Sequence, residues 1–313
     1  MSEAPHRIVA IDWSGRVDAP GQRRHIYAAS WTAAEALPPA AQKRARDQGR
    51  AGVVQLTNGR TREETASWLI DLSRSTPSMV VGFDFCFSFP EWFVHGEHGC
   101  TTGPEFWRLV TEQHGERWLA PGQTDPRFWG KPGKRPAEFS GDHLHRMLRA
   151  ADISCKLTAY IPDAERAARI RGITPKSVFQ IGGSGSVGTA SLRGMPILLR
   201  LRRAGFRVWP FDPPQLADAN PAPLVVEMYS RLNTGPVHKS NPSARAAYLL
   251  AKRNSEATYT QLSPEVLRRA RRSEDAFDAL VSCMAMVEHR STFAHLPPPL
   301  DPKYVIEGWT WAP

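Results

Sequence analysis

The chain has 313 residues, of which 41% are hydrophobic and 23% charged. This balance excludes a disordered chain and allows one large domain or two smaller ones. Lysine and arginine number 40 against 31 acidic residues, an excess that permits a polyanionic partner but does not require one. No apolar run reaches the length of a membrane span, no secretion signal is recognisable, and the four cysteines are far apart. We therefore expect a cytoplasmic protein with reduced thiols.

The first 84 residues predict strands, a helix and a further strand. The predicted strands are residues 8–11, 25–31, 53–56 and 78–83. The first ends at Asp12, the last ends at Asp84, and the first two are joined by a polar hairpin loop. Thr61 and Glu64 have the spacing of a capping box at the start of the helix. Hairpin-linked strands followed by a helical crossover indicate a mixed α/β sheet with helices on its faces.

The middle of the chain predicts an insertion. Residues 85–140 hold six prolines and four tryptophans, and residues 141–175 have a helical pattern rich in arginine. We expect a core formed by residues 1–90 and 177–313, with residues 91–176 inserted as a cap.

One part of this cap is a candidate nucleic-acid contact, because cations stand next to an aromatic ring. These candidates are Trp129, Lys131, Lys134 and Arg135. Aromatic faces and cations together hold single-stranded nucleic acid. The alternative is a cap whose tryptophans form a small core of their own.

The remaining residues predict a second series of elements. They are helices at 191–204, 242–253, 264–272 and 273–287, strands at 206–211 and 224–229, and a tail at 304–311 that docks on the domain. The glycine-rich loop 182–188 lacks the lysine of a P-loop. It opens a helix, so its backbone N–H groups could still meet a phosphate, with Ser184 and Ser186 as contacts. The alternative is an ordinary strand-to-helix turn.

Acidic residues recur at strand ends and on the last helix. Asp12 and Asp84 follow strands, Glu227 lies inside one, and Asp275 and Asp278 share a face of the last helix. Carboxylates gathered from separate elements repel one another unless divalent cations join them. Mg²⁺ and Mn²⁺ prefer oxygen ligands, and two such ions about 4 Å apart can hold both oxygens of a phosphodiester displacement.

Four segments resemble the motifs of a known family. Residues 10–15, 82–90, 226–229 and 275–280 are similar to those of the predicted ribonuclease H-like nucleases, bacterial and archaeal proteins that carry the domain of unknown function numbered four hundred and twenty-nine. The resemblance extends from residue 8 to about residue 287, and the tryptophan-rich stretch from 91 to 140 has no counterpart in it. It implies a ribonuclease H-like core in which the metal-binding and catalytic acids are Asp12, Asp84, Glu227 and Asp278, with Asp275 as an interchangeable fifth ligand.

Three functions remain open on this basis. The first is a nuclease that uses Mg²⁺ or Mn²⁺ to hydrolyse phosphodiester bonds of RNA or DNA. The second is a nucleotide-binding phosphotransferase or ATPase related to actin, in which the Asp-x-x-Gly turn at residues 12–15, including Ser14, and the loop 182–188 would hold a nucleotide. The third is a non-catalytic module that binds nucleic acid or a protein.

Overall fold

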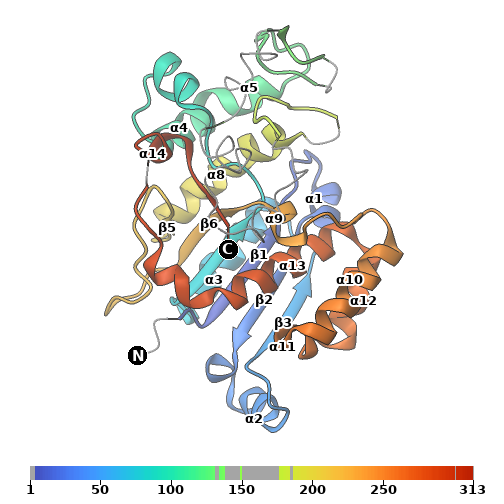
Figure 1. Ribbon diagram of the computed structural model, residues 1–313. Coiled ribbons are helices and arrows are strands. Elements are labelled where there is room, and N and C mark those ends of the chain that lie inside the picture. Colours follow the sequence, from blue (N-terminus) through green and yellow to red (C-terminus); the bar gives the residue numbers. More distant parts are fainter. Residues whose placement is uncertain are drawn as a thin grey trace.

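The computed structural model describes residues 4–130, 134–137, 149, 176–183, 186–299 and 301–312. A single mixed sheet of seven strands runs through the molecule, with helices packed on both faces (Figure 1). The predicted α/β class with a mixed sheet is therefore confirmed. Among the described helices, none is long and apolar enough to cross a membrane.

The sheet brings the carboxyl ends of its central strands to one edge. Its strands are β1 (Arg7–Asp12), β2 (Tyr27–Ala33), β3 (Gly52–Thr57), β4 (Met79–Phe83), β5 (Arg207–Val208), β6 (Leu224–Met228) and β7 (Thr310–Trp311). Their order is β3-β2-β1-β4-β6-β5, and β7 pairs with the end of β6. The β1–β2 and β2–β3 pairs are antiparallel, whereas β4 is parallel to both β1 and β6. Ligands of open α/β sheets collect beyond the carboxyl ends of parallel strands, so this edge is where a site is expected.

Alternate residues of β1 point into two hydrophobic layers. Val9 and Ile11 pack in a cluster with side chains of α3 (Arg62–Ser75) and α8 (Val187–Arg203). Ile8 and Ala10 face the opposite layer, which is built from α10 (Pro242–Ser255), α11 (Ala257–Thr260), α12 (Pro264–Arg272) and α13 (Glu274–Glu288). Because both faces of β1 are buried, its sequence is a continuous apolar run and not an alternating one.

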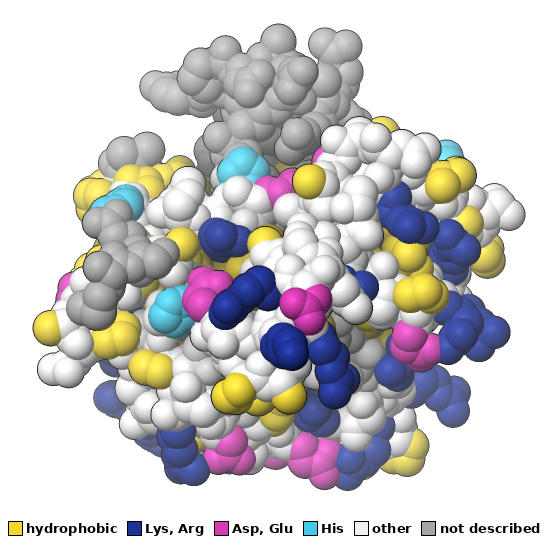
Figure 2. Space-filling view, turned by 90° about the horizontal axis from the view of Figure 1, so that it is seen from below, with side chains coloured by type: hydrophobic (Ala, Val, Ile, Leu, Met, Phe, Trp, Pro, Cys, Tyr) yellow, Lys and Arg dark blue, Asp and Glu magenta, His cyan; other side chains and the backbone are white. Residues whose placement is uncertain are grey.

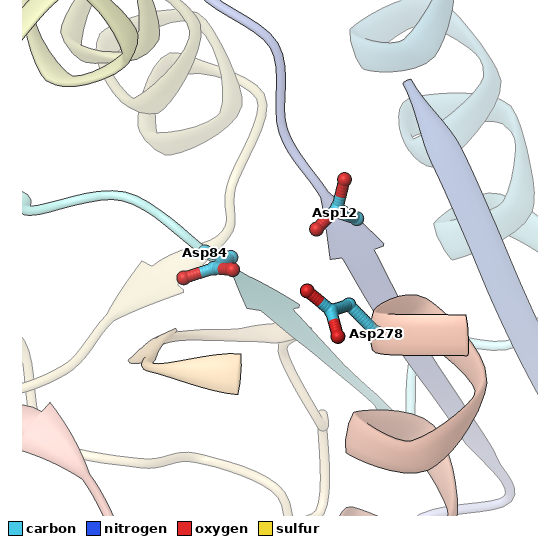
Figure 3. Close-up of side chains that lie close together, drawn as sticks. All are labelled: Asp12, Asp84 and Asp278. Atoms are coloured by element: carbon cyan, nitrogen blue, oxygen red, sulfur yellow. The ribbon is translucent and has the colours of Figure 1, made fainter. Parts of the chain in front are cut away.

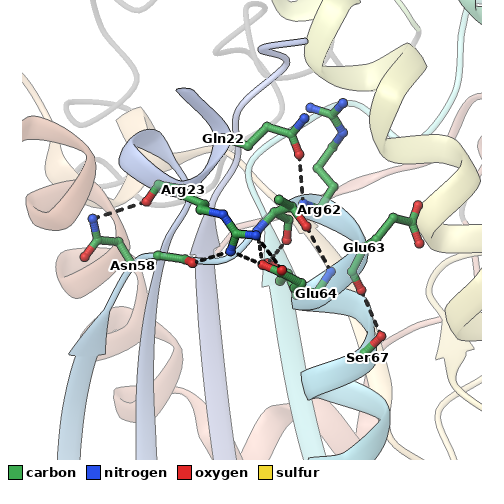
Figure 4. Close-up of polar contacts among 10 residues, drawn as sticks. Gln22, Arg23, Asn58, Arg62, Glu63, Glu64 and Ser67 are labelled. Atoms are coloured by element: carbon green, nitrogen blue, oxygen red, sulfur yellow. Dashed lines mark hydrogen bonds and ion pairs between the residues drawn. The ribbon is translucent and has the colours of Figure 1, made fainter. Parts of the chain in front are cut away.

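The start of α3 follows the predicted capping box. The Thr61 hydroxyl accepts a hydrogen bond from the Glu64 N–H at 3.3 Å, and the Glu64 carboxylate accepts one from the Thr61 N–H at 2.9 Å. Arg23 also forms an ion pair with this carboxylate and donates to the Gly59 carbonyl at 2.9 Å (Figure 4). These contacts tie the β1–β2 connection to the start of α3.

That connection differs from the predicted hairpin loop, because it contains helix α1 (Ala19–His25). The Asp18 side chain caps the helix by accepting from the Gly21 N–H at 2.6 Å. Pro20 lies in the first turn, where a missing N–H costs no hydrogen bond. Pro20 and Gly21, which are common in turns, here belong to a capped helix.

The described part of the predicted cap shares the core of the sheet. It contains η2 (Trp92–Glu97), α4 (Gly103–Leu109), η3 (Val110–His114) and α5 (Gly115–Leu119). Phe93, Phe106 and Trp118 belong to the same buried cluster as Val9 and Ile11. Residues 91–130 therefore extend the layer formed by α3 and α8. The predicted helical stretch at 141–175 lies outside the described residues, apart from Arg149.

The tail docks as predicted, with α14 (Tyr304–Glu307) and β7 closing over the end of β6. The predicted strand at 206–211 is shorter than expected, since β5 covers only Arg207–Val208. Pro210 follows, and a proline has no N–H to offer the strand ladder. The remaining described elements are η1 (Ala34–Ala36), α2 (Pro39–Asp47), α9 (Ser230–Thr234) and η8 (Arg290–His295).

Candidate metal centre

Three aspartates meet at the carboxyl edge of the sheet (Figure 3). Asp12 is the last residue of β1, and Asp84 directly follows β4, where its N–H donates to the Ile11 carbonyl at 3.2 Å. Asp278 comes from the second turn of α13, which begins at the N-cap Ser273 and packs against β1 and β2. Each aspartate offers one carboxylate oxygen, and these three oxygens lie within 4.8 Å of one another. Among the described residues, this is the one group of acidic, histidine or cysteine ligands with such geometry.

The aspartates repel one another and are partly removed from water. Burial, followed by the charges of Asp278 and Asp84, raises the pKa of Asp12 well above its usual value. Burial also raises the pKa of Asp84, although Ser230 and Lys239 oppose that shift. The pKa of Asp278 is raised to about 6, again chiefly by burial and against the pull of Lys239. Clustered acids with raised pKa values indicate a site that a cation would stabilise.

Two neighbours satisfy part of this charge. Lys239 forms an ion pair with one oxygen of Asp278, and the Ser230 hydroxyl lies 3.4 Å from the same oxygen. Burial lowers the pKa of Lys239, but the aspartates raise it by more, so its net shift is upward and the group stays an ammonium. The Ser230 N–H is 3.5 Å from the Asp84 carboxylate.

The other oxygen of Asp278 has no hydrogen-bond partner among the described residues. Asp278 is 3% exposed, and this oxygen, Oδ1, is buried. An unsatisfied buried carboxylate oxygen is costly unless a donor or a cation meets it. Asp12, Asp84 and Asp278 together provide carboxylate oxygens, the hard donors that Mg²⁺ and Mn²⁺ prefer. The residues present therefore fit a divalent cation.

The expectation that Glu227 joins this set has to be corrected. Glu227 is 2% exposed and pairs with Arg149, which is fully buried. One Arg149 nitrogen lies 2.8 Å from the Glu227 carboxylate, which also accepts from the Phe87 N–H and the Thr310 hydroxyl, each at 2.7 Å. With its oxygens engaged by these donors, Glu227 acts as a structural anchor beside the site and is left out of the proposed ligand set.

Asp275 also lies outside the three-aspartate group. Its carboxylate contacts the His25 Nδ1 atom at 2.8 Å, whereas Asp278, one turn later, reaches the centre. Asp275 and Asp278 are therefore not interchangeable in this structure, although the charge of Asp275 still acts on Asp12.

The predicted substrate contacts fall in several environments. Trp129 is 5% exposed and packs in the core, so its ring is not available to stack on a base, and that expectation is corrected. Lys134 and Arg135 are exposed, while Lys131 and Ser184 lie outside the described residues.

Ser14 belongs to a closed turn and not to an open phosphate loop. Its side chain is buried, and the following Gly15 packs so closely on α8 that a Cβ atom there would lie 2.8 Å from the Ala190 nitrogen. Arg193 of α8 also donates to the Gly15 carbonyl. The actin-like alternative, in which residues 12–15 would hold a nucleotide, stays a prediction.

A cavity of about 350 Å³ opens beside Asp84. Its polar lining includes Lys176, Ser186, Tyr229 and Lys239, and its apolar lining includes Phe85, Val187, Ala190, Met228 and Leu232. Of these, sequence reasoning selected only Ser186. Lys239 lies in a loop whose sequence carries no recognisable motif, and only the fold brings it to the aspartates.

The arrangement can bind a divalent cation and place an anionic group beside it. Its elements are three carboxylate oxygens, lysine ammonium groups and the N-terminus of the long helix α8, which begins at the cavity wall. Comparisons with protein-family models, curated proteins and solved structures found no significant match to this chain.

Proposed function

We propose that this protein hydrolyses phosphodiester bonds of nucleic acid with the help of a divalent cation held by Asp12, Asp84 and Asp278. The observation that carries the proposal is the approach of three aspartate oxygens, from three separate elements, to within 4.8 Å of one another. The lysine-bearing cavity next to them supports an anionic substrate. The mixed sheet is compatible with the ribonuclease H-like core that the sequence motifs imply, and that core is part of the proposal.

The charges present favour one ion over two. Asp12, Asp84 and Asp278 bring three negative charges when ionised, and Lys239 returns one positive charge. One divalent ion balances the remaining two. Glu227, the fourth acid expected from the sequence, is already neutralised by Arg149, so a second ion lacks the carboxylates that it needs.

Several residues around the aspartates have roles in this chemistry. A bound divalent ion lowers the pKa of water and stabilises charge on a leaving oxygen. Lys239 and Ser230 fix the orientation of Asp278. Burial, followed by the charge of Asp84, raises the pKa of Tyr229 to about 12. Tyr229 therefore remains a hydroxyl that can donate a hydrogen bond to a phosphate oxygen in the cavity.

The test is cleavage of labelled single-stranded and duplex RNA and DNA, and of bis(p-nitrophenyl) phosphate, in Mg²⁺ or Mn²⁺. We expect the wild type to cleave, and we expect Asp12→Asn, Asp84→Asn and Asp278→Asn to lose at least about 100-fold in rate, as is typical when an electrostatic catalytic group is removed. Asp275→Asn is the matched control, because it makes the same charge change one turn away on α13. Equal losses in Asp275→Asn and Asp278→Asn, or wild-type cleavage in excess EDTA, would refute the proposed site.

A further inference from the structure

A second charged hollow lies away from the aspartates, between α10 and α12. It has a volume of about 500 Å³ and an apolar floor formed by Leu262, Pro264 and Leu267. Its walls carry four exposed arginines, Arg253, Arg268, Arg271 and Arg272. Figure 2 shows Lys and Arg side chains predominating on the side at which Figure 1 places α10 and α12.

Most of this positive charge is not neutralised by the protein. Within the residues that the structure describes, no ion pair involves Arg253, Arg271 or Arg272, whereas Arg268 pairs with Glu265. Arg268 and Arg272 are four residues apart on α12, and like charges at that spacing destabilise a helix. A helix C-terminus tolerates basic residues because of its dipole, but the dipole does not explain why arginines of two helices converge on one hollow. A bound anion does.

The hollow is connected to the aspartate centre by a buried arginine. Arg245 of α10 is 3% exposed, and it donates two hydrogen bonds, at 3.1 and 2.7 Å, to the carbonyl of Arg271. Its remaining terminal nitrogen donates to the carbonyl of Lys239, the residue whose ammonium pairs with Asp278. The wall of the hollow and the edge of the metal centre are thus held in a fixed relation by one side chain.

We infer that this hollow binds the phosphate backbone of a nucleic acid and holds a strand whose continuation reaches the aspartate centre. The planar guanidinium group binds two phosphate oxygens at once, which is why arginine is favoured wherever phosphates are recognised. A positively charged groove of this kind follows the backbone of a single strand, and the floor of Leu262, Pro264 and Leu267 offers apolar contact to the sugars between successive phosphates. The choice of nucleic acid over other polyanions rests on the proposed function, but the binding itself does not depend on hydrolysis.

The test is equilibrium binding in EDTA, where no cleavage can occur. The fluorescence anisotropy of a labelled single-stranded oligonucleotide is measured over a series of salt concentrations for three variants. In the first, Arg253, Arg271 and Arg272 are all changed to Gln. In the control, Lys43, Arg44 and Arg46 on the exposed surface of α2 are changed to Gln, which removes the same charge from a helix that does not line the hollow. The third is Glu265→Gln, which releases Arg268 from its ion pair.

We expect the triple hollow variant to bind about tenfold or more weakly and its salt dependence to fall by about 2 in slope, because each lost phosphate contact on a single strand accounts for about 0.7. The α2 variant should stay within about twofold of the wild type, and Glu265→Gln should bind more tightly. Equal losses in the two triple variants overturn the inference. The inference is also overturned if polyglutamate displaces the labelled oligonucleotide as effectively as unlabelled oligonucleotide does, because the partner would then be an acidic protein.

The two proposals fail in different ways. If wild type does not bind the oligonucleotide but still hydrolyses bis(p-nitrophenyl) phosphate, the hollow is not a nucleic-acid site and the metal centre stands. If binding weakens when the arginines are replaced and no substrate is hydrolysed, the hollow is a nucleic-acid site and the proposed hydrolytic function fails. Should the triple hollow variant unfold, Glu265→Gln decides the matter, since unchanged or weaker binding contradicts the inference.

Discussion

Replacing Asp12 with asparagine should stabilise this protein when no divalent cation is present. Asp12 is an acid with a raised pKa in a cluster of like charges, and no side-chain hydrogen bond of Asp12 is seen among the described residues. Asparagine has nearly the same shape and no charge, so it relieves repulsion without removing a native partner. Most substitutions at half-buried positions destabilise, which makes this expected gain diagnostic of a functional site.

The gain comes from the cost of ionising Asp12 itself, since burial and the charges of Asp278, Asp84 and Asp275 all raise its pKa. Each pKa unit of such a shift corresponds to about 1.4 kcal/mol of lost stability once the group is ionised. Asn cannot ionise, so Asp12→Asn should gain on the order of 1–2 kcal/mol. For a chain of 313 residues, 1 kcal/mol corresponds to roughly 1.5 °C in Tm, which gives a rise of about 2–3 °C.

The pH dependence has a definite sign. Between about pH 4 and pH 6 the folded protein holds a proton on Asp278 that the unfolded chain has released, so the free energy of unfolding falls as the pH rises. Below that window the acids are protonated in both states and the cost is absent, and above it the cost is complete. The pKa of Asp12 is raised in the same direction, so the advantage of Asp12→Asn should be small near pH 4 and should grow as the pH rises through the raised pKa of Asp12.

Adding the cation should reverse the order of the two proteins. A ligand at 100 times its Kd stabilises the native state by about 2.7 kcal/mol, or about 4 °C here. The Tm of the wild type should rise by this amount in Mn²⁺, whereas the Tm of Asp12→Asn should rise little. The assay is thermal unfolding of both proteins in EDTA and over a titration of Mn²⁺ at pH 7.5. A lower Tm for Asp12→Asn in EDTA, or the same rise with Mn²⁺ in both, would show that these carboxylates do not form a cation site.

Other consequences of the structure can be measured separately. Glu227→Gln should lower the free energy of unfolding by about 3–5 kcal/mol, since it leaves the buried charge of Arg149 without its carboxylate; a loss below about 1 kcal/mol in urea unfolding would contradict this. Thr61→Ala should cost about 1 kcal/mol because it removes the N-cap of α3, and Ser75→Ala serves as its control, since this exposed hydroxyl bonds only to the Leu72 carbonyl of the same helix. Gly194→Ala should cost about 1–3 kcal/mol, because a Cβ atom there would lie 2.4 Å from the Phe85 ring; Phe85 follows Asp84, so the response to Mn²⁺ should weaken as well. Titration calorimetry should find one Mn²⁺ per chain, and two would contradict the charge balance proposed for the site.

Local signals in the sequence were enough to predict the elements that carry the aspartates. The apolar run 8–11 and the acid that ends it identify β1, and Ser273 marks the start of α13. Such signals are local because a strand buried on both faces and a capped helix each leave a continuous pattern. The convergence of Asp12, Asp84 and Asp278 was expected from the resemblance, but the sequence alone did not separate Asp278 from Asp275. That choice depends on the rotation of α13 against β1, which is a tertiary property.

The role of Glu227 could not be predicted, because its partner Arg149 lies 78 residues away in the chain. An acid inside an apolar strand has two physical solutions, a metal ion or a buried cation of the protein. Both leave the same mark on the sequence, an isolated glutamate among valines. Lys239 and Tyr229 are similar, since a lysine in a loop and a tyrosine after a strand are common in any protein. The fold alone makes them neighbours of the aspartates.

The contrast between Glu227 and the aspartates shows how this edge of the sheet is organised. Asp12, Asp84 and Glu227 lie at or near the end of a parallel strand, and Glu227 pairs in register with Phe83, the residue before Asp84. The glutamate charge is fully satisfied by Arg149, Phe87 and Thr310, which fixes β6 and the docked tail. The aspartates have Lys239 and Ser230 as partners, and one buried oxygen of Asp278 has no hydrogen-bond partner among the described residues. Stability alone would favour a partner for each acid, so the contrast between the under-neutralised aspartates and the neutralised glutamate is what motivates the proposal of a bound cation.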